Sequence, residues 1–442
     1  MDTAVRSRRR GADLLAAAAG LGLLVTVALA VSAESASSLR APGGVATALG
    51  RLTGLLGAYA MLLMVLLVAR LPALERVVGQ DRLLTWHRRI GGWPIVLVAL
   101  HGVLIAVGYG QAAKTGALHE LGVLLTTYPG VLAGTTGFGL LVMAGVTSYR
   151  NVRRRMAYET WWAVHLYTYL ALALAFSHQV TTGASFVGHP VARAWWTALW
   201  LGTAGLVVAY RVLLPVWRSL RHRLRVVAVE QEGPGVVSLV CRGHRLDRLA
   251  FHGGQFLQWR FLARGLWWQA HPYSPSALVH DSHLRVTVRD LGDHSGLLAR
   301  LKPGTRIAVE GPYGTFTKHA RRGDRVLLVG AGVGVTPLRA LLEDLPAHVQ
   351  ADVILRASTP QELVLSEEMS RLAARRGGRV HELVGSRTEV RVDRDALRGL
   401  IPDLAERDVY VCGPDGFADR IVRAARGAGV RGDRIHRESF AF

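Results

Sequence analysis

The chain has 442 residues, half of them hydrophobic, and a formal net charge of +21 at neutral pH. This length allows two to four domains. Residues 1–217 are dominated by apolar side chains, whereas 218–442 have the composition of an ordinary soluble protein. Much of the basic excess lies in short loops beside apolar segments, so attraction to anionic lipid headgroups is favoured over nucleic-acid binding. The two cysteines form no Cys-x-x-Cys motif and indicate no disulfide framework.

Six apolar segments each have the length needed to cross a hydrocarbon core of about 30 Å. They cover residues 14–31, 52–69, 90–108, 131–149, 160–180 and 194–214. Arginines cluster at 6–10, 70–89 and 150–155, whereas the opposite loops carry few basic residues, among them Arg40 and Lys114. We therefore expect six transmembrane helices in the cell (plasma) membrane, with the amino terminus and the soluble half in the cytoplasm. The first segment could also be a signal peptide, but its apolar run is longer than a usual signal core.

Four histidines lie in or beside these segments: His87 just before the third, His101 within it, and His165 and His178 in the fifth. On an ideal helix His87 and His101 share a face about 21 Å apart along the axis. His165 and His178 lie about 20 Å apart but roughly 140° out of phase. Either the fifth helix is distorted or its histidines approach their partners from different angles.

Ionisable groups inside a membrane are costly and usually functional. Matching depths pair His87 with His165 near the cytoplasmic side and His101 with His178 near the outer side. Each pair could supply the two axial nitrogens of a b-type haem, which gives two haem b groups and four iron ligands. Hydrogen-bonded polar residues inside the bundle are one alternative. A zinc site is another, although zinc prefers three or four clustered ligands.

Haem propionates are anionic and need partners near each membrane surface. Arg88 and Arg89 could serve the inner haem and Arg51 the outer one, although they could also be orientation charges or snorkelling side chains. Trp93 lies between the two histidines of the third helix and could bridge the haems or simply pack. Pro94 is expected to bend that helix.

Short alternating strands follow in the soluble half, at 223–230, 235–242, 255–262, 283–290 and 305–311. This pattern predicts an antiparallel barrel over about 220–322. From Arg325 strands and helices alternate, which is typical of a parallel α/β domain. The segment GAGVGVTP (330–337) follows a strand and opens a helix, as a loop that binds phosphates through its backbone would. It matches neither G-x-G-x-x-G nor a P-loop, so alone it is a weak signal.

The motifs that accompany this segment form a more specific pattern. HPYS (271–274), GDHS (292–295), GPYG (311–314), GVGVTP (332–337), CGP (412–414) and ESF (438–440) occur in this order. Together they resemble the ferredoxin–NADP⁺ reductase superfamily, and HPYS is similar to the form found in membrane ferric reductases and NADPH oxidases. The histidine-bearing segments resemble the transmembrane domain of the same group, so the resemblance covers about 48–442.

The resemblance implies a multi-domain protein. A six-helix transmembrane dihaem bundle would occupy 1–217, an antiparallel β-barrel FAD domain 218–322, and a parallel α/β nucleotide-binding domain 323–442. The residues implied to hold the flavin are His271, Pro272, Tyr273 and Ser274, with Arg289 and Ser295 on the FAD pyrophosphate. Those implied for NAD(P)H are Gly332, Gly334, Thr336 and Pro337 at its pyrophosphate, and Cys412, Gly413 and Pro414 near the nicotinamide. Phe440 would cover the isoalloxazine, a role for which Phe442 competes. Turn glycines and core aromatics are the plainer alternatives.

The second strand of the α/β domain ends in Arg356, Ala357 and Ser358 without a carboxylate. Arg356 and Ser358 suit a 2′-phosphate, so NADPH is favoured over NADH.

We therefore expect electrons to pass from cytoplasmic NAD(P)H through FAD and two b haems to an extracytoplasmic acceptor. Dioxygen is the first choice, a ferric chelate the second and a periplasmic protein the third. A transporter or channel with a redox-sensing flavin domain is the alternative from another class. No obligate protein partner is indicated.

Overall fold

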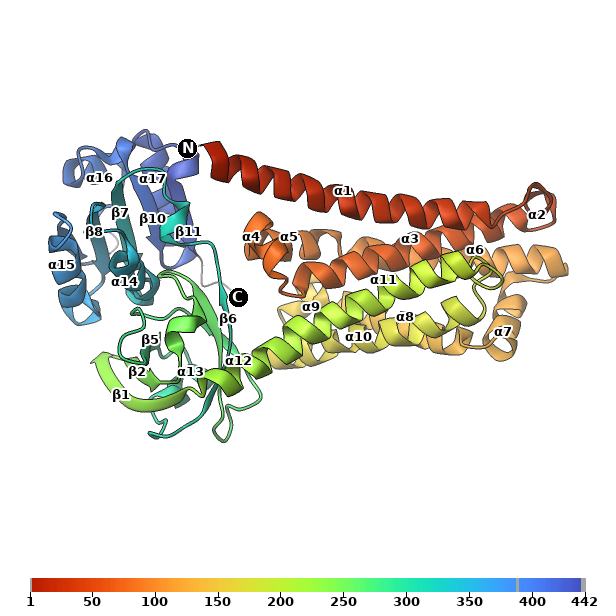
Figure 1. Ribbon diagram of the computed structural model, residues 1–442, viewed down its shortest axis with the longest axis horizontal. Coiled ribbons are helices and arrows are strands. Elements are labelled where there is room, and N and C mark those ends of the chain that lie inside the picture. The colour runs from red at the N-terminus through yellow and green to blue at the C-terminus, as the bar shows by residue number, and fades with distance from the viewer. Residues whose placement is uncertain (1, 387–388, 439–442) are drawn as a thin grey trace. The chain divides into compact units, whose positions relative to one another are not determined.

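The computed structural model describes residues 2–386 and 389–438 (Figure 1). It divides into two units, residues 2–211 and the chain from Val212 onward. This division lies near the expected boundary at 217/218 and falls inside a continuous helical stretch, where a short π-helical segment (Ala209–Leu213) follows α11.

The first unit is helical. Its elements are α1 (Asp2–Ser32), α2 (Ala36–Arg40), α3 (Gly44–Val68), α4 (Pro72–Val78), α5 (Gln80–Ile90), α6 (Gly92–Ala113), α7 (Ala117–Thr127), α8 (Val131–Ser148), α9 (Arg150–Arg153), α10 (Tyr158–Thr181) and α11 (Pro190–Val208). Among the described residues, five helical stretches are long and apolar enough to cross a membrane: Arg10–Ser32, Gly44–Val68, Arg82–Ala113, Val131–Ser148 and Pro190–His222. They correspond to five of the six expected spans.

The remaining expected span, 160–180, forms α10, whose 24 residues are long enough to cross. It is not among the five apolar stretches, and it carries Glu159, His165, His178 and Gln179 along its length. Because α10 is an uninterrupted α-helix, its two histidines must approach their partners from different angles. This decides between the two alternatives that the spacing had left open.

The expected bend near Pro94 takes the form of an interruption at Gly91, which separates α5 from α6. Proline has no N–H to donate and crowds the preceding turn, so the irregularity precedes it. As a result His87 lies on α5 and His101 on α6. Close packing then brings α6 against α3: a Cβ at Gly57 would lie 2.9 Å from Val98 Cγ2. Small residues allow such an approach between membrane helices.

The second unit begins with α12 (Leu214–His222) and two three-stranded antiparallel sheets, ordered β1-β2-β5 and β4-β3-β6. Their strands are β1 (Arg225–Gly233), β2 (Val236–Arg242), β3 (Phe256–Phe261), β4 (His271–Tyr273), β5 (His283–Arg289) and β6 (Ile307–Tyr313). Isolated bridges at Arg225–Arg306 and Pro275–Val286 link the two sheets, and one buried core that includes Leu239, Trp259 and Val286 fills the space between them. These are features of a barrel. The short strand β4 was not expected.

The rest of the unit is an α/β domain around a five-stranded parallel sheet, ordered β11-β10-β7-β8-β9. The strands are β7 (Arg325–Ala331), β8 (Gln350–Ala357), β9 (Val380–Val384), β10 (Asp408–Cys412) and β11 (Ile435–Glu438). Alternate residues of β7 face opposite sides: Val326 and Leu328 pack with α14 (Val335–Asp344) and α15 (Ser366–Ala374). Leu327 and Val329 pack with α16 (Arg394–Leu400) and α17 (Asp415–Gly427). Helices therefore cover both faces, as the strand and helix rhythm predicted.

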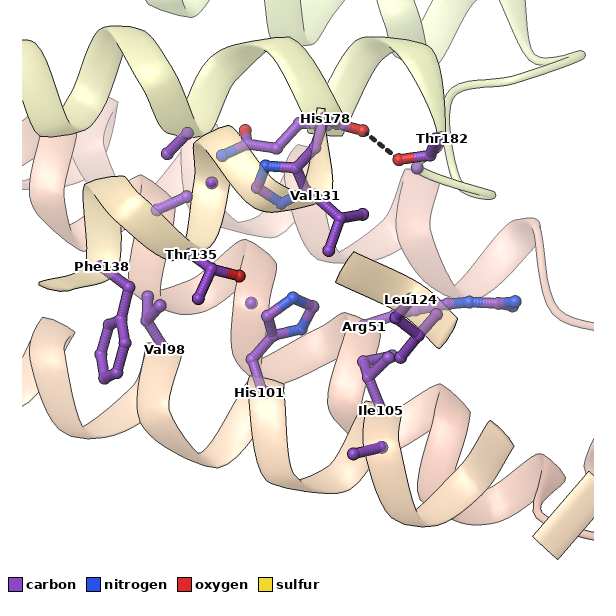
Figure 2. A pocket seen from close by; sticks show the side chains of 18 of the residues that line it. Arg51, Val98, His101, Ile105, Leu124, Val131, Thr135, Phe138, His178 and Thr182 are labelled. Atoms are coloured by element: carbon purple, nitrogen blue, oxygen red, sulfur yellow. Dashed lines mark hydrogen bonds between the residues drawn. The ribbon is translucent and has the colours of Figure 1, made fainter. Parts of the chain in front are cut away.

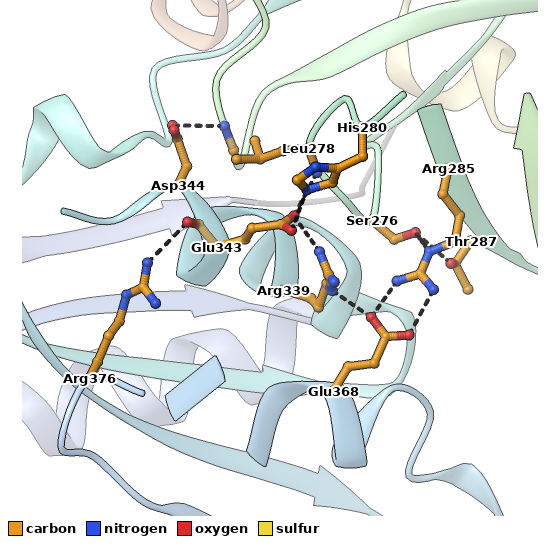
Figure 3. A network of polar contacts seen from close by, with 11 residues as sticks. Ser276, Leu278, His280, Arg285, Thr287, Arg339, Glu343, Asp344, Glu368 and Arg376 are labelled. Carbon is orange, nitrogen blue, oxygen red and sulfur yellow. Dashed lines mark hydrogen bonds and ion pairs between the residues drawn. The ribbon is translucent and has the colours of Figure 1, made fainter. Parts of the chain in front are cut away.

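Charged side chains join the barrel to the α/β domain (Figure 3). Glu368 of α15 accepts two hydrogen bonds of 2.7 Å from the Arg285 guanidinium of β5 and a third, also 2.7 Å, from Arg339 Nε of α14. Glu343 of α14 accepts from the backbone N–H of Leu278 at 2.7 Å. Burial opposes ionisation of Glu368, but its bonds to the two arginines outweigh burial and lower its pKa.

We expect Glu368→Gln to loosen this joint, because the amide loses the charge that satisfies two partly buried guanidinium groups. The cost should be about 2 kcal/mol, or a midpoint roughly 5 °C lower for the reductase half. Thermal unfolding of the purified chain measures it. Glu367→Gln is the matched control, since this carboxylate lies one residue away and is exposed. Equal midpoints for the two variants would contradict a joining role for Glu368.

Candidate functional site

The inner pair of histidines meets as expected. The ring centroids of His87 on α5 and His165 on α10 lie 6.1 Å apart, with their planes at 72°. Two nitrogens each about 2 Å from a shared ion would place the rings on the order of 6 Å apart. His87 Nδ1 donates to the carbonyl of Met64 at 3.1 Å. His165 Nδ1 contacts Ser148 Oγ at 3.4 Å, and its ring stacks on Trp161.

The outer pair lines a cavity of about 530 Å³ inside the helical unit (Figure 2). His101 enters it from α6 and His178 from α10, and most of the other lining side chains are apolar. His101 Nδ1 donates to the Gly50 carbonyl at 2.7 Å. His178 Nδ1 is buried without a hydrogen-bond partner in the part of the chain that the structure describes.

These contacts assign the tautomers. A backbone carbonyl can only accept, so Nδ1 of His87 and of His101 carries the proton and Nε2 keeps its lone pair. Metal-binding histidines are usually held this way, with the non-ligating nitrogen bonded to a backbone carbonyl or a side chain. No group of three or more His, Cys, Asp or Glu side chains that could hold a metal ion occurs among the described residues. The four histidines are therefore described as two pairs.

The arginines differ in their surroundings. Arg51 lines the same cavity as His101 and His178, and its Nη1 pairs with Glu34 Oε1 at 2.8 Å. Arg88 and Arg89 are exposed beside His87. Trp93 is 67% exposed on the surface of the helical unit, so the structure does not support a bridging role between the two pairs, which was one of the two alternatives for this residue.

The HPYS residues lie at one strand of the barrel. His271, Pro272 and Tyr273 form β4, which pairs with β3. Trp259 Nε1 donates to the Tyr273 carbonyl at 2.9 Å, and burial raises the pKa of the Tyr273 hydroxyl. Ser274 is buried, and its Oγ has no hydrogen-bond partner within the described chain. A buried hydroxyl without a partner is available to hydrogen-bond to a polar group of a bound molecule.

Sequence reasoning missed His294 of the GDHS motif. Its ring lies 3.6 Å from that of His271, and both of its nitrogens are buried without a hydrogen bond to any described residue. Burial, with the charge of His271 second, lowers the pKa of His294 to about 4, so the ring is neutral at neutral pH. Ser295 Oγ accepts from the Leu291 N–H at 2.8 Å and so shapes the turn.

The structure brings the two nucleotide motifs together. In register, Cys412 of β10 lies beside Gly330 of β7. A Cβ at Gly334 would lie 2.4 Å from the Cys412 carbonyl oxygen, so only glycine allows this approach. Gly332 adopts a φ of +56°, and its missing Cβ would lie 3.5 Å from Arg289 Nη1.

Other members of the predicted set have structural contacts. Thr336 Oγ1 donates to the Val333 carbonyl at 2.9 Å, and Pro337 is buried in the first turn of α14. The loop from Cys412 through Gly413 to Pro414 leads into α17. Burial raises the pKa of the Cys412 thiol well above its usual value, and the thiol belongs to the sheet core. The side chain of Cys412 therefore faces the sheet core, and only its backbone is part of the loop. Phe440 and Phe442 lie outside the described residues.

The coenzyme prediction rested on the lack of a carboxylate at the end of β8, and the structure supplies one. Glu362 Oε2 accepts from the Ser358 N–H at 3.0 Å, and its other oxygen lies 3.5 Å from Arg289 Nη2. Arg356 donates to the carbonyls of Leu383, Gly385 and Ser386. These bonds tie the guanidinium to the backbone that the chain reaches about thirty residues later, a contact that sequence spacing does not reveal.

Comparison with known proteins agrees with both halves. The family described as "Ferric reductase like transmembrane component" matches residues 53–176, which include His87, His101 and His165. The family described as "Oxidoreductase NAD-binding domain" matches residues 328–423, which include the GVGVTP and CGP segments.

Among curated proteins, an NADPH oxidoreductase of Mycobacterium tuberculosis is 28% identical over 236 residues, 51% of this chain and 62% of that protein. The NADH oxidoreductase HCR of Escherichia coli is 30% identical over 232 residues, 49% of this chain and 67% of that protein. A glycine betaine monooxygenase reductase subunit of Chromohalobacter salexigens is 27% identical over 246 residues, 52% and 67% of the two chains. This chain thus spans about three-fifths to two-thirds of the length of these relatives. The chain belongs to the NAD(P)H-dependent oxidoreductases of the ferredoxin–NADP⁺ reductase type and carries a ferric reductase-like transmembrane component before that module, a combination that fits a ferric reductase or NADPH oxidase-like fusion.

Proposed function

We propose that this chain moves electrons from cytoplasmic NAD(P)H through FAD and two b-type haems to an acceptor outside the cell membrane, and that the acceptor is dioxygen. One observation carries the proposal. Two histidine pairs lie on α5, α6 and α10. In His87 and His101, Nδ1 bonds to a carbonyl, so Nε2 keeps its lone pair. The same chain carries an oxidoreductase module.

Named residues would hold each group. His87 and His165 would hold the inner haem, and His101 and His178 the outer one. Arg89 and Arg51 would meet the propionates, which for Arg51 means exchanging or sharing its bond with Glu34. Ser274 Oγ and the β4 backbone would hold FAD, with Arg289 at its pyrophosphate. When bound, FAD would take two electrons from NAD(P)H, and the haem irons would carry them singly.

The residues around the outer pair bear on the acceptor. Leu55, Val98, Ile105 and Phe138 line the cavity beside His101, and apolar side chains favour an apolar solute over water or a charged solute. Dioxygen is small and apolar and can enter it. A ferric chelate is charged, so as the alternative acceptor it would have to take electrons at the protein surface.

The orientation is also a proposal. The arginines near 70–89 and 150–155 favour a cytoplasmic position for those loops and for the reductase half. We propose a multi-pass protein of the cell membrane on that basis, with the lipid bilayer and NAD(P)H as partners and without an obligate protein partner.

The test is to reduce the purified chain with NADPH or NADH and follow its visible spectrum. We expect b-type haem bands at two haems per chain, reduction that depends on FAD, and reoxidation by dioxygen with superoxide as product. Faster reoxidation by a ferric chelate would replace dioxygen by the alternative acceptor. A chain without haem would instead indicate a transporter or channel with a redox-sensing flavin domain, and would overturn the proposal.

A second prediction concerns His101, one of the two histidines of the outer pair. His101→Ala removes one nitrogen of the outer pair, so reduction of the acceptor should fall by at least tenfold while flavin reduction by NAD(P)H stays at its normal rate. Stopped-flow absorbance separates the two steps. His119→Ala is the matched control, because this histidine is exposed on α7. Normal acceptor turnover in His101→Ala would show that the outer pair is not on the electron route.

Glu362 provides a prediction on the coenzyme. A carboxylate at the end of the second strand favours a ribose 2′-hydroxyl and repels a 2′-phosphate. Glu362→Gln should therefore raise kcat/KM for NADPH relative to NADH, by on the order of tenfold for one removed charge repulsion. Steady-state kinetics with both coenzymes measure the ratio, and Glu367→Gln is the exposed control. An unchanged ratio would mean that Glu362 does not face the coenzyme.

A further inference from the structure

Each histidine of the outer pair lies against a glycine of a neighbouring helix. A Cβ at Gly54 of α3 would lie 2.6 Å from His101 Nδ1 and 3.0 Å from its Cγ and Cε1. A Cβ at Gly134 of α8 would lie 2.5 Å from His178 Nδ1 and 2.9 Å from its Cε1. These distances are far below van der Waals contact, so a methyl group at either position would push the imidazole away.

The two rings are held differently beyond that contact. His101 Nδ1 donates to the carbonyl of Gly50, one helical turn before Gly54 on the same face of α3. The ring is therefore fixed by one hydrogen bond and one steric contact on the same helix. His178 Nδ1 makes no such hydrogen bond to a described residue of a neighbouring helix, so its position relative to α8 depends more heavily on its fit against Gly134.

We propose that Gly54 and Gly134 are positioning residues for the outer pair: the space left by their missing side chains sets where the two rings lie and where each Nε2 points. This inference rests on the proposed function, because it gives these rings the task of holding the outer haem. The inner pair is bounded otherwise, by Met64, Ser148 and Trp161.

A purely structural role predicts the opposite result for an alanine substitution. Glycine inside a helix is less favourable than alanine by about 1 kcal/mol. If nothing depended on the space at these positions, Gly54→Ala and Gly134→Ala would be neutral or would stabilise α3 and α8. A displaced histidine would instead show as a change at the haem.

The test measures haem per chain and the midpoint potentials of purified full-length variants. Gly139→Ala on α8 and Gly202→Ala on α11 are open controls, since a Cβ there meets nothing within 4 Å and neither residue lines the cavity. Gly57→Ala on α3 is the crowded control, since its Cβ would meet Val98 at 2.9 Å and Leu97 at 3.2 Å without touching a histidine.

We expect the wild-type chain and the three controls to bind two haems. Gly54→Ala and Gly134→Ala should each fall to about one haem per chain, and the remaining haem should still be reduced by NAD(P)H. Two haems with unchanged potentials in both variants would overturn the inference, as would the same loss in Gly57→Ala. A wild-type chain that binds no haem would overturn the proposed function instead, so the two failures are distinguishable.

Discussion

The hydrogen bond from an imidazole N–H to a backbone carbonyl of α3 is the interaction on which the membrane half depends. His87 donates to Met64 and His101 to Gly50, so one helix orients a histidine at each level. A buried imidazole without such a partner is costly, and with it Nε2 keeps its lone pair. The bonds require α5 and α6 to lie close to α3, and the small residues of α3 allow the close approach of α6.

The reductase half depends on a different constraint, the parallel register of its central sheet. Because β10 lies beside β7, the CGP segment ends where the GVGVTP loop begins. The bonds of Glu368 and Glu343 then hold this domain against the barrel. A hydride acceptor and its donor must meet at close range. The ion pairs between the barrel and the α/β domain hold the domain with β4 against the domain with the GVGVTP loop.

Much of the fold could be predicted from local patterns. Five of the barrel strands lie within a few residues of their expected positions, and strands alternate with helices from Arg325 as expected, because periodicity is a local property. The strand β4 was missed because it is three residues long and contains Pro272. The contacts of Glu362, His294 and Glu368 were missed because each joins segments that lie apart in the sequence or involves a residue outside every motif.

The sequence by itself determined that this is a membrane protein with a reductase half, since apolar length, loop charge and motif order are written in consecutive residues. It also determined which four histidines could matter. Tertiary structure decided the rest: the meeting of His87 with His165, the protonated nitrogen of His87 and of His101, the cavity that His101 shares with His178, and the glycines against the outer rings. These outcomes depend on how closely helices approach one another, which is set by packing between distant residues and not by any local pattern.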